Sequence, residues 1–134
     1  MTDSDARRFD GKVVLITGGA GAIGMATARR FSTEGAKLVI VDRNRDQAET
    51  LVEALRVTGT TALGVAADVG DKAGVDAAVD AALQTFGRID VLFNNAGISG
   101  KIAPVYDLEP ADWDDIIRVN LRGMFSSNGR PCAP

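Results

Sequence analysis

Short apolar runs alternate with longer amphipathic segments along this chain. The apolar runs are rich in valine and isoleucine, and such continuous runs are typical of strands that are buried on both faces of a sheet. They predict four strands, at residues 13–16, 37–41, 61–66 and 90–93. Between and after these strands, apolar residues three and four positions apart predict four helices, at residues 22–34, 45–57, 72–86 and 110–125.

The alternation of strands and helices determines the expected fold class. Because parallel strands need long crossover connections, we expect an α/β fold with a doubly wound parallel sheet and helices on both faces. The usual strand order in such a Rossmann-like domain is 3-2-1-4. We expect this domain to span residues 10–125 and to stop after the fourth helix. Residues 1–9 are expected to form a flexible tail that ends where Phe9 docks, and the turn-rich residues 126–134 an irregular C-terminal tail.

A glycine-rich stretch joins the first predicted strand to the first predicted helix. Gly19, Gly21 and Gly24 match the spacing G-x-G-x-x-G, and Gly18 precedes them. Glycines let the backbone approach a ligand closely, and the helix that begins near Ala22 directs unpaired N–H groups and a positive dipole into the loop. The stretch therefore suits a pyrophosphate, and a purely structural turn is the alternative. No Gly-Lys-Ser/Thr follows, which excludes a Walker A loop.

Asp42 follows the second predicted strand, 18 residues after Gly24. An acidic residue about 20 positions beyond the glycines supports a dinucleotide site, because its carboxylate accepts hydrogen bonds from the adenosine ribose. The same charge repels a 2′-phosphate, so we expect NAD rather than NADP, although Arg43 and Arg45 lie nearby. The local alternative is that Asp42 is a helix cap or a turn former.

Two further polar segments follow strands of the predicted sheet. Asp68 and Val69 lie beyond the third strand, where Asp68 fits a helix cap as well as a ligand contact. The fourth strand runs into a loop made of Asn94, Asn95, Ala96 and Gly97. In the expected strand order, strands one and four are neighbours whose connections leave on opposite sides. This loop and the glycine-rich stretch should therefore open onto one crevice.

Asn120 is a polar residue on an apolar helix face. That face consists of Trp113, Ile116, Ile117, Leu121 and Met124. A buried amide needs a hydrogen-bond partner, so Asn120 marks either a structural contact or a catalytic one. The acidic residues at the start of this helix complement its dipole, and we do not interpret them as a metal site: Glu109, Asp112, Asp114 and Asp115.

Composition and charge exclude several classes of function. The 134 residues carry a net charge of −3 and no basic stripe, which argues against nucleic acids and anionic membranes as partners. No apolar stretch is long enough to span a membrane and residues 1–10 hold no apolar leader core, so we expect a cytoplasmic protein. One cysteine and no histidine exclude an internal disulfide, zinc sites, and Ser-His-Asp or Cys-His catalysis.

These motifs together resemble the short-chain dehydrogenase/reductase family in spacing and order over residues 9–125. The matching residues are Thr17, Gly18, Ile23, Gly24, Asp42, Asp68, Val69, Asn94, Asn95, Ala96, Gly97 and Asn120. Ala22 stands where the family usually has a glycine, and its methyl group crowds the pyrophosphate turn modestly.

The resemblance implies a role for each matching segment. For the dinucleotide, it implies that the loop with Gly18, Gly21, Ile23 and Gly24 holds the pyrophosphate, that Asp42 binds the adenosine ribose, and that Asp68 and Val69 contact the adenine. It also implies that residues 94–97 support the cofactor and the central sheet. Asn120 is similar to the family's catalytic asparagine, which holds a water in a proton relay.

The resemblance also shows what this sequence lacks. The family's catalytic Ser, Tyr and Lys lie beyond the asparagine helix, and Tyr106, the single tyrosine, is followed four residues later by Pro110 instead of Lys. We therefore expect the cofactor-binding half of an NAD-dependent oxidoreductase, which transfers hydride between the nicotinamide and a small alcohol or carbonyl and is inactive on its own. A truncated or frame-shifted copy is our preferred interpretation, and a genuine short tail is the alternative.

Two other functions remain as hypotheses. The first is a non-catalytic dinucleotide-binding or sensing module. The second is a methyltransferase-like domain that binds S-adenosylmethionine, although residues 94–97 and Asn120 do not belong to that pattern.

A chain of this kind would leave the fourth strand on an exposed sheet edge. Val91, Leu92 and Phe93 would form that edge, and the inner side of the last helix would be uncovered. Because apolar edges template association, we expect a marginally stable protein that forms homo-oligomers or aggregates.

Overall fold

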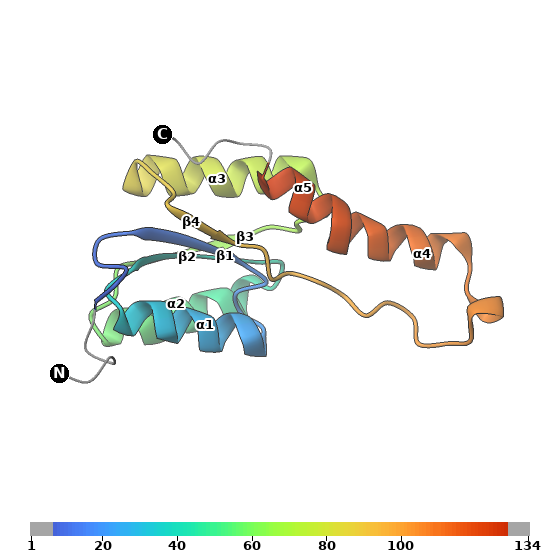
Figure 1. The fold of residues 1–134 in the computed structure, drawn as a ribbon, viewed down its shortest axis with the longest axis horizontal. Helices are drawn as coiled ribbons and strands as arrows, with labels where there is room; N and C mark the ends of the chain where they lie inside the picture. The colour runs from blue at the N-terminus through green and yellow to red at the C-terminus, as the bar shows by residue number, and fades with distance from the viewer. Residues whose placement is uncertain (1–6, 129–134) are drawn as a thin grey trace.

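A parallel sheet forms the centre of the molecule (Figure 1). The computed structural model describes residues 7–128, and its strands lie in the order β3-β2-β1-β4. They are β1 (Val13–Thr17), β2 (Lys37–Asp42), β3 (Ala62–Ala66) and β4 (Val91–Phe93). Each strand begins and ends within one residue of its expected position. The order confirms the doubly wound, Rossmann-like α/β fold.

Helices cover both faces of the sheet. In Figure 1, α1 (Ala22–Thr33) and α2 (Arg45–Val57) lie on one face, and α3 (Lys72–Phe86) lies on the other. Successive strand residues point to opposite faces, so Val14 and Ile16 belong to the core against α1 and α2, whereas Val13 and Leu15 belong to the core against α3. Because β1 is buried on both faces, its sequence is a continuous apolar run without alternation.

The helix ends follow from local sequence. Asn44 begins α2, where its side chain accepts a hydrogen bond from Gln47 N at 3.1 Å. Gly87 ends α3 in the left-handed region, with φ of 76°, which a residue with a Cβ atom rarely adopts.

A second helical unit follows β4 after a long loop. A short 3-10 turn, η2 (Val105–Asp107), precedes α4 (Pro110–Ile117), the π-helical segment η3 (Arg118–Arg122) and α5 (Gly123–Asn128). The last three form one continuous helical rod, and in Figure 1 α5 lies beside α3 while α4 projects away from the sheet. The rod packs closely against Val69 where α5 begins. A Cβ atom on Gly123 would lie only 2.9 Å from a methyl group of Val69, so this contact depends on the absence of a side chain.

The rod continues beyond the expected helix end. We expected irregular structure after Phe125, and this is wrong for residues 126–128, which remain helical. Two side chains satisfy their hydrogen bonds within the helix: Ser127 Oγ donates to Gly123 O at 2.8 Å and Asn128 Nδ2 donates to Met124 O at 3.0 Å. The expected tail residues 1–6 and 129–134 lie outside the described residues.

Phe9 docks onto the fold, as expected. Its ring packs edge-on against Phe31, with the ring centroids 4.7 Å apart. Its backbone N–H donates to Glu34 O at 3.1 Å.

The apolar stripe of the rod is not buried. Trp113 and Leu121 expose 66% and 61% of their surface, because none of the elements within residues 7–128 covers this side of the rod. Within the same range β4 pairs with β1 alone and forms a sheet edge, as expected. None of the helices in this range has the length and apolar character that a membrane crossing needs.

Candidate functional site

A cleft of about 360 Å³ opens at the carboxyl ends of the strands. Its lining consists of Gly18, Gly21, Ala22, Ile23, Asp42, Arg43, Ala67, Asp68, Val69, Asn95, Ala96, Gly97, Ile98 and Val119. All the site residues predicted from the sequence line this cleft except Gly24, Asn94 and Asn120. The sheet topology therefore brings together loops that are far apart in sequence, at the place where α/β folds bind ligands.

The glycines of the loop after β1 serve different steric needs. Gly18 has a φ of +60°, and a Cβ on it would lie 2.7 Å from Ala96 Cα. Gly24 lies under the loop, where a Cβ would lie 2.7 Å from Gly19 Cα. A Cβ on Gly21, in contrast, would be 3.4 Å from its nearest neighbour. Gly18 and Gly24 are thus required by the packing of the loop, whereas Gly21 leaves space on the cleft side.

The loop after β4 is tied to the glycine-rich loop by Asn95 and Thr17. Asn95 Nδ2 donates to Thr17 O and Gly18 O, both at 3.1 Å. Thr17 Oγ1 accepts hydrogen bonds from Asn95 N at 3.0 Å and Ala96 N at 3.2 Å. These bonds hold the two walls of the cleft at a fixed separation. The sequence pointed to Asn95 but gave no role to the Thr17 hydroxyl.

Asp42 faces the glycine-rich loop from the end of β2. Its Oδ2 accepts a hydrogen bond from Ala20 N at 3.1 Å, and its Oδ1 accepts one from Asn44 N at 2.9 Å. The second bond is the turn-forming contact that we considered as the local alternative, and the first bond links the carboxylate to the loop. Each oxygen has another lone pair, so the carboxylate can still accept hydrogen bonds from a ligand hydroxyl.

Asp68 is held from two sides. Its Oδ1 accepts a hydrogen bond from Gly70 N at 2.8 Å, and its Oδ2 accepts one from Arg118 Nη1 at 2.9 Å. Partial burial raises the pKa of Asp68, but the hydrogen bond from Arg118, the bond from Gly70 and the positive charge of Arg118 outweigh it, so the pKa lies below its ordinary value. Asp68 does not cap α3, because Asp71 does so by accepting from Ala73 N at 3.2 Å.

Asn120 lies behind the cleft, in the π-helical segment η3. Its Oδ1 accepts a hydrogen bond from Ile98 N at 2.8 Å and its Nδ2 donates to Ile98 O at 2.9 Å. The side chain therefore has the structural partner that its half-buried position demands, and it fixes the loop after β4 on the rod. π-helical turns inside α-helices occur frequently at functional sites.

Sequence reasoning missed Arg118, which reaches the cleft residue Asp68 from η3. No local motif marks this arginine, because its partner lies 50 residues earlier in the chain.

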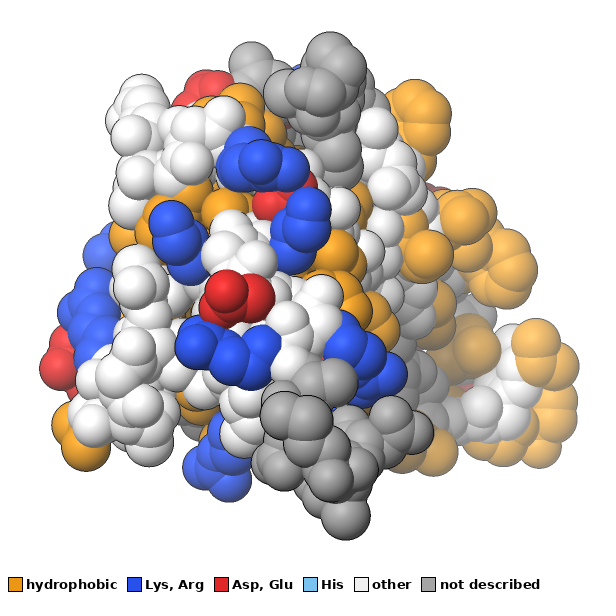
Figure 2. Space-filling view, turned by 60° about the vertical axis from the view of Figure 1, so that its left-hand side comes forward, with side chains coloured by type: hydrophobic (Ala, Val, Ile, Leu, Met, Phe, Trp, Pro, Cys, Tyr) orange, Lys and Arg blue, Asp and Glu red, His pale blue; other side chains and the backbone are white. Residues whose placement is uncertain are grey.

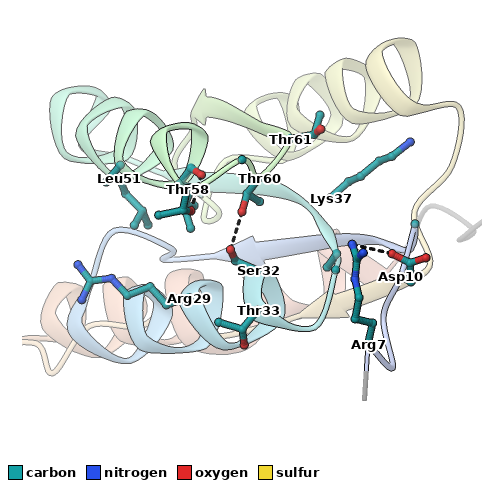
Figure 3. A pocket seen from close by; sticks show the side chains of 16 residues that line it. Arg7, Asp10, Arg29, Ser32, Thr33, Lys37, Leu51, Thr58, Thr60 and Thr61 are labelled. Carbon is teal, nitrogen blue, oxygen red and sulfur yellow. Dashed lines mark hydrogen bonds and ion pairs between the residues drawn. The ribbon is translucent and has the colours of Figure 1, made fainter. Parts of the chain in front are cut away.

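A second cavity, of about 570 Å³, lies at the opposite end of the sheet and holds none of the predicted site residues (Figure 3). Two pairs of its polar groups bind one another: Arg7 with Asp10 at 2.8 Å, and the hydroxyls of Ser32 and Thr60 at 2.5 Å. Lys and Arg side chains with a few acidic ones among them are spread over the face shown in Figure 2. Because the cleft brings together most of the predicted site residues and this cavity holds none of them, we assign the site to the cleft.

Comparison with known proteins establishes the class to which this chain belongs. The family model for short chain dehydrogenase matches residues 12–128, so the chain is a member of the short-chain dehydrogenase family. It is 46% identical over 126 residues to levodione reductase from Leifsonia aquatica, an alignment that covers 92% of this chain and 47% of the relative. It is 45% identical over 118 residues to D-threitol dehydrogenase from Mycolicibacterium smegmatis, which covers 88% of this chain and 45% of that enzyme.

Solved structures agree with this membership. A 3-ketoacyl-(acyl-carrier-protein) reductase from Brucella melitensis complexed with NADH matches with a TM-score of 0.84 and 46% identity, over 90% of this chain and 48% of that one. An NAD⁺-bound xylitol dehydrogenase matches with a TM-score of 0.85 and 39% identity, over 90% and 46% of the two chains. The chain thus spans about half the length of the relatives that it matches.

Proposed function

We propose that this chain is the NAD(H)-binding half of an oxidoreductase that transfers hydride between the nicotinamide and a small alcohol or carbonyl. In this proposal, the loop with Gly18 and Gly21 holds the pyrophosphate and Asp42 accepts hydrogen bonds from the adenosine ribose. Asn95 ties the two walls of the cleft to each other, and Asn120 holds the loop next to the nicotinamide.

The Asp42 carboxylate is the observation that carries the preference for NAD(H). It lies in the cleft beside the glycine-rich loop, 3.1 Å from Ala20 N. A carboxylate at this place accepts hydrogen bonds from two ribose hydroxyls and repels a 2′-phosphate. Arg43 lines the same cleft and would attract that phosphate, so the balance between the two residues determines the choice of cofactor. NAD(H) in two matching structures supports the same choice.

A titration with NADH and NADPH tests this proposal. The unaltered chain should bind NADH more tightly than NADPH, and Asp42→Asn should weaken NADH binding by about tenfold, because a charge-assisted hydrogen bond is lost. NADPH binding should be unchanged or tighter. Asp46→Asn is the matched control, since Asp46 carries the same charge in the first turn of α2 and does not line the cleft. Equal affinity of the unaltered chain for both cofactors would refute the preference for NAD(H).

A turnover assay tests whether the chain is inactive on its own. The single tyrosine, Tyr106, lacks a lysine four residues later, so the Tyr-x-x-x-Lys pair of the family does not occur in this sequence. We therefore expect residues 1–134 on their own to bind the dinucleotide without hydride transfer. The chain should bind NADH but should not oxidise it with a panel of small ketones and aldehydes. NADH oxidation that saturates with the carbonyl compound would refute this expectation.

A further inference from the structure

Arg118 connects the helical rod to the cleft. Its Nη1 donates to Asp68 Oδ2 at 2.9 Å, while its Nε and Nη2 donate to Asp115 Oδ1 at 3.0 and 2.8 Å. Asp115 lies one turn earlier on the same rod, whereas Asp68 lies just beyond β3. The guanidinium is therefore fixed on its own helix and extends one further donor to the cleft. Its planar arrangement of N–H groups lets it hold both carboxylates in fixed directions.

The lack of a side chain at Gly70 makes room for this arrangement. A Cβ on Gly70 would lie 2.7 Å from Arg118 Cζ and closer still to Nη1. The guanidinium therefore packs directly on the Gly70 backbone, and the Gly70 N–H donates to the other oxygen of Asp68 at 2.8 Å. Together, Gly70 and Arg118 hold the carboxylate from both sides.

The held carboxylate has a defined chemical character. With its pKa lowered, Asp68 is ionised at neutral pH and can only accept hydrogen bonds. Its side chain is 44% exposed and lines the cleft, and each oxygen has a further lone pair beyond its bond to Gly70 or Arg118. In an adenine nucleotide the exocyclic amino group is the only N–H donor of the base, so it is the complementary group.

We propose that Arg118 is a positioning residue for the dinucleotide, which orients the Asp68 carboxylate so that it accepts a hydrogen bond from the exocyclic amino group of adenine. The inference rests on the proposed function, since it requires a dinucleotide in the cleft. It also links recognition of the adenine to the segment η3 that carries Asn120, two residues further along.

A comparison of NADH with its reduced hypoxanthine analogue tests this role. The analogue has a carbonyl oxygen in place of the amino group, so it should bind the unaltered chain about tenfold more weakly than NADH. Arg118→Gln removes the guanidinium, and Gly70→Ala displaces it without changing any charge. Both variants should bind NADH more weakly and should reduce the ratio of the two affinities towards one.

Two further variants sharpen the test. Arg122→Gln removes the same charge from the same π-helical segment, and Arg122 makes no ion pair within residues 7–128, so this control should retain the ratio of the unaltered chain. Arg118→Lys retains the positive charge and one donor, and it should restore part of the ratio. Circular dichroism establishes that each variant is folded before it is titrated.

The outcomes separate this role from general stabilisation. Weaker binding of both ligands with an unchanged ratio in Arg118→Gln and Gly70→Ala would overturn the inference and leave the proposed function intact. An equal loss of the ratio in Arg122→Gln would overturn it as well, because net charge would then be the cause. If both Arg118→Gln and Gly70→Ala fail to fold, the pair serves the fold and the inference is wrong. If the unaltered chain binds neither ligand, the proposed function fails first.

Discussion

Gly24→Ala tests whether the packing of α1 on the glycine-rich loop holds this fold together. The new methyl group would lie 2.7 Å from Gly19 Cα and 2.9 Å from Gly19 C, and closer still to Gly18 O. These are backbone atoms of a tight turn, so they cannot rotate away from the methyl group. The helix that packs here is the one that directs its N-terminus at the cleft.

The expected magnitude follows from two opposing terms. Alanine is favoured over glycine in a helix interior by about 1 kcal/mol. Inserting a methyl group into a packed site costs about 1–3 kcal/mol, and immobile backbone neighbours place Gly24 at the upper end of that range. We expect a net loss of about 2 kcal/mol in the free energy of unfolding, which for a chain of this length lowers Tm by roughly 6–10 °C.

Thermal and urea denaturation, followed by far-UV circular dichroism, measures this loss. Gly74→Ala is the matched control, because Gly74 also lies in a helix but its nearest neighbour would be 3.3 Å from the new Cβ. The control should lose clearly less stability than Gly24→Ala, because it gains the same helix propensity and its closest contact requires only a small shift. Gly24→Ala melting within about 2 °C of the unaltered chain would refute the reasoning. So would a loss in Gly74→Ala as large as that in Gly24→Ala.

Two further predictions concern the buried acid and the bridging amide. Hydrogen bonds from the Arg8 side chain lower the pKa of Glu34 more than burial raises it. A hydrogen bond from Arg30 lowers it further, so the pKa falls from 4.5 to about 2. Glu34 therefore stabilises the fold above pH 4.5 and loses this contribution as the pH falls towards 2; Tm measured against pH should fall less steeply over this range in Glu34→Gln. Asn95→Ala removes the bonds to Thr17 O and Gly18 O and should cost about 1–3 kcal/mol in urea denaturation. Asn94→Ala is its control, since the Asn94 amide makes no hydrogen bond within residues 7–128, and an equal loss in both variants would contradict this assignment.

Much of the fold could be predicted from the sequence because its signals are local. Runs such as Val13–Ile16 and Leu38–Val41 are buried on both faces, and each is short enough to be a strand and too apolar to be a loop. Residues such as Gly35, Gly59 and Gly87 mark helix ends by their left-handed backbone. The expected end of the last helix was wrong because Ser127 and Asn128 are weak helix formers in isolation, and their side chains find carbonyl partners only once the helix exists.

The candidate site could be predicted only in part, because some of its contacts span the chain. Gly18 and Asp42 carry motifs with a fixed spacing, and the topology brings both to one cleft. Arg118 has no such signal, since its role depends on how the rod is placed against the loop after β3. Periodicity predicts the apolar stripe with Trp113 and Leu121 but does not show whether another element covers it. The expectation that one side of the last helix is uncovered comes instead from the resemblance, and the stripe is exposed within the described residues.

The cleft and the exposed apolar stripe of the rod belong to different parts of the described chain. The walls of the cleft come from the ends of β1, β2, β3 and β4 and are held by hydrogen bonds within residues 7–128, such as Asn95 to Thr17 and Arg118 to Asp68. The exposed apolar stripe with Trp113 and Leu121 instead lies along the rod, and β4 forms a sheet edge within the described residues. A ligand that binds the folded cleft stabilises the whole fold by mass action, without covering those surfaces. NADH should therefore raise the stability of the chain, and the association that we expect through the apolar rod should persist when NADH is bound.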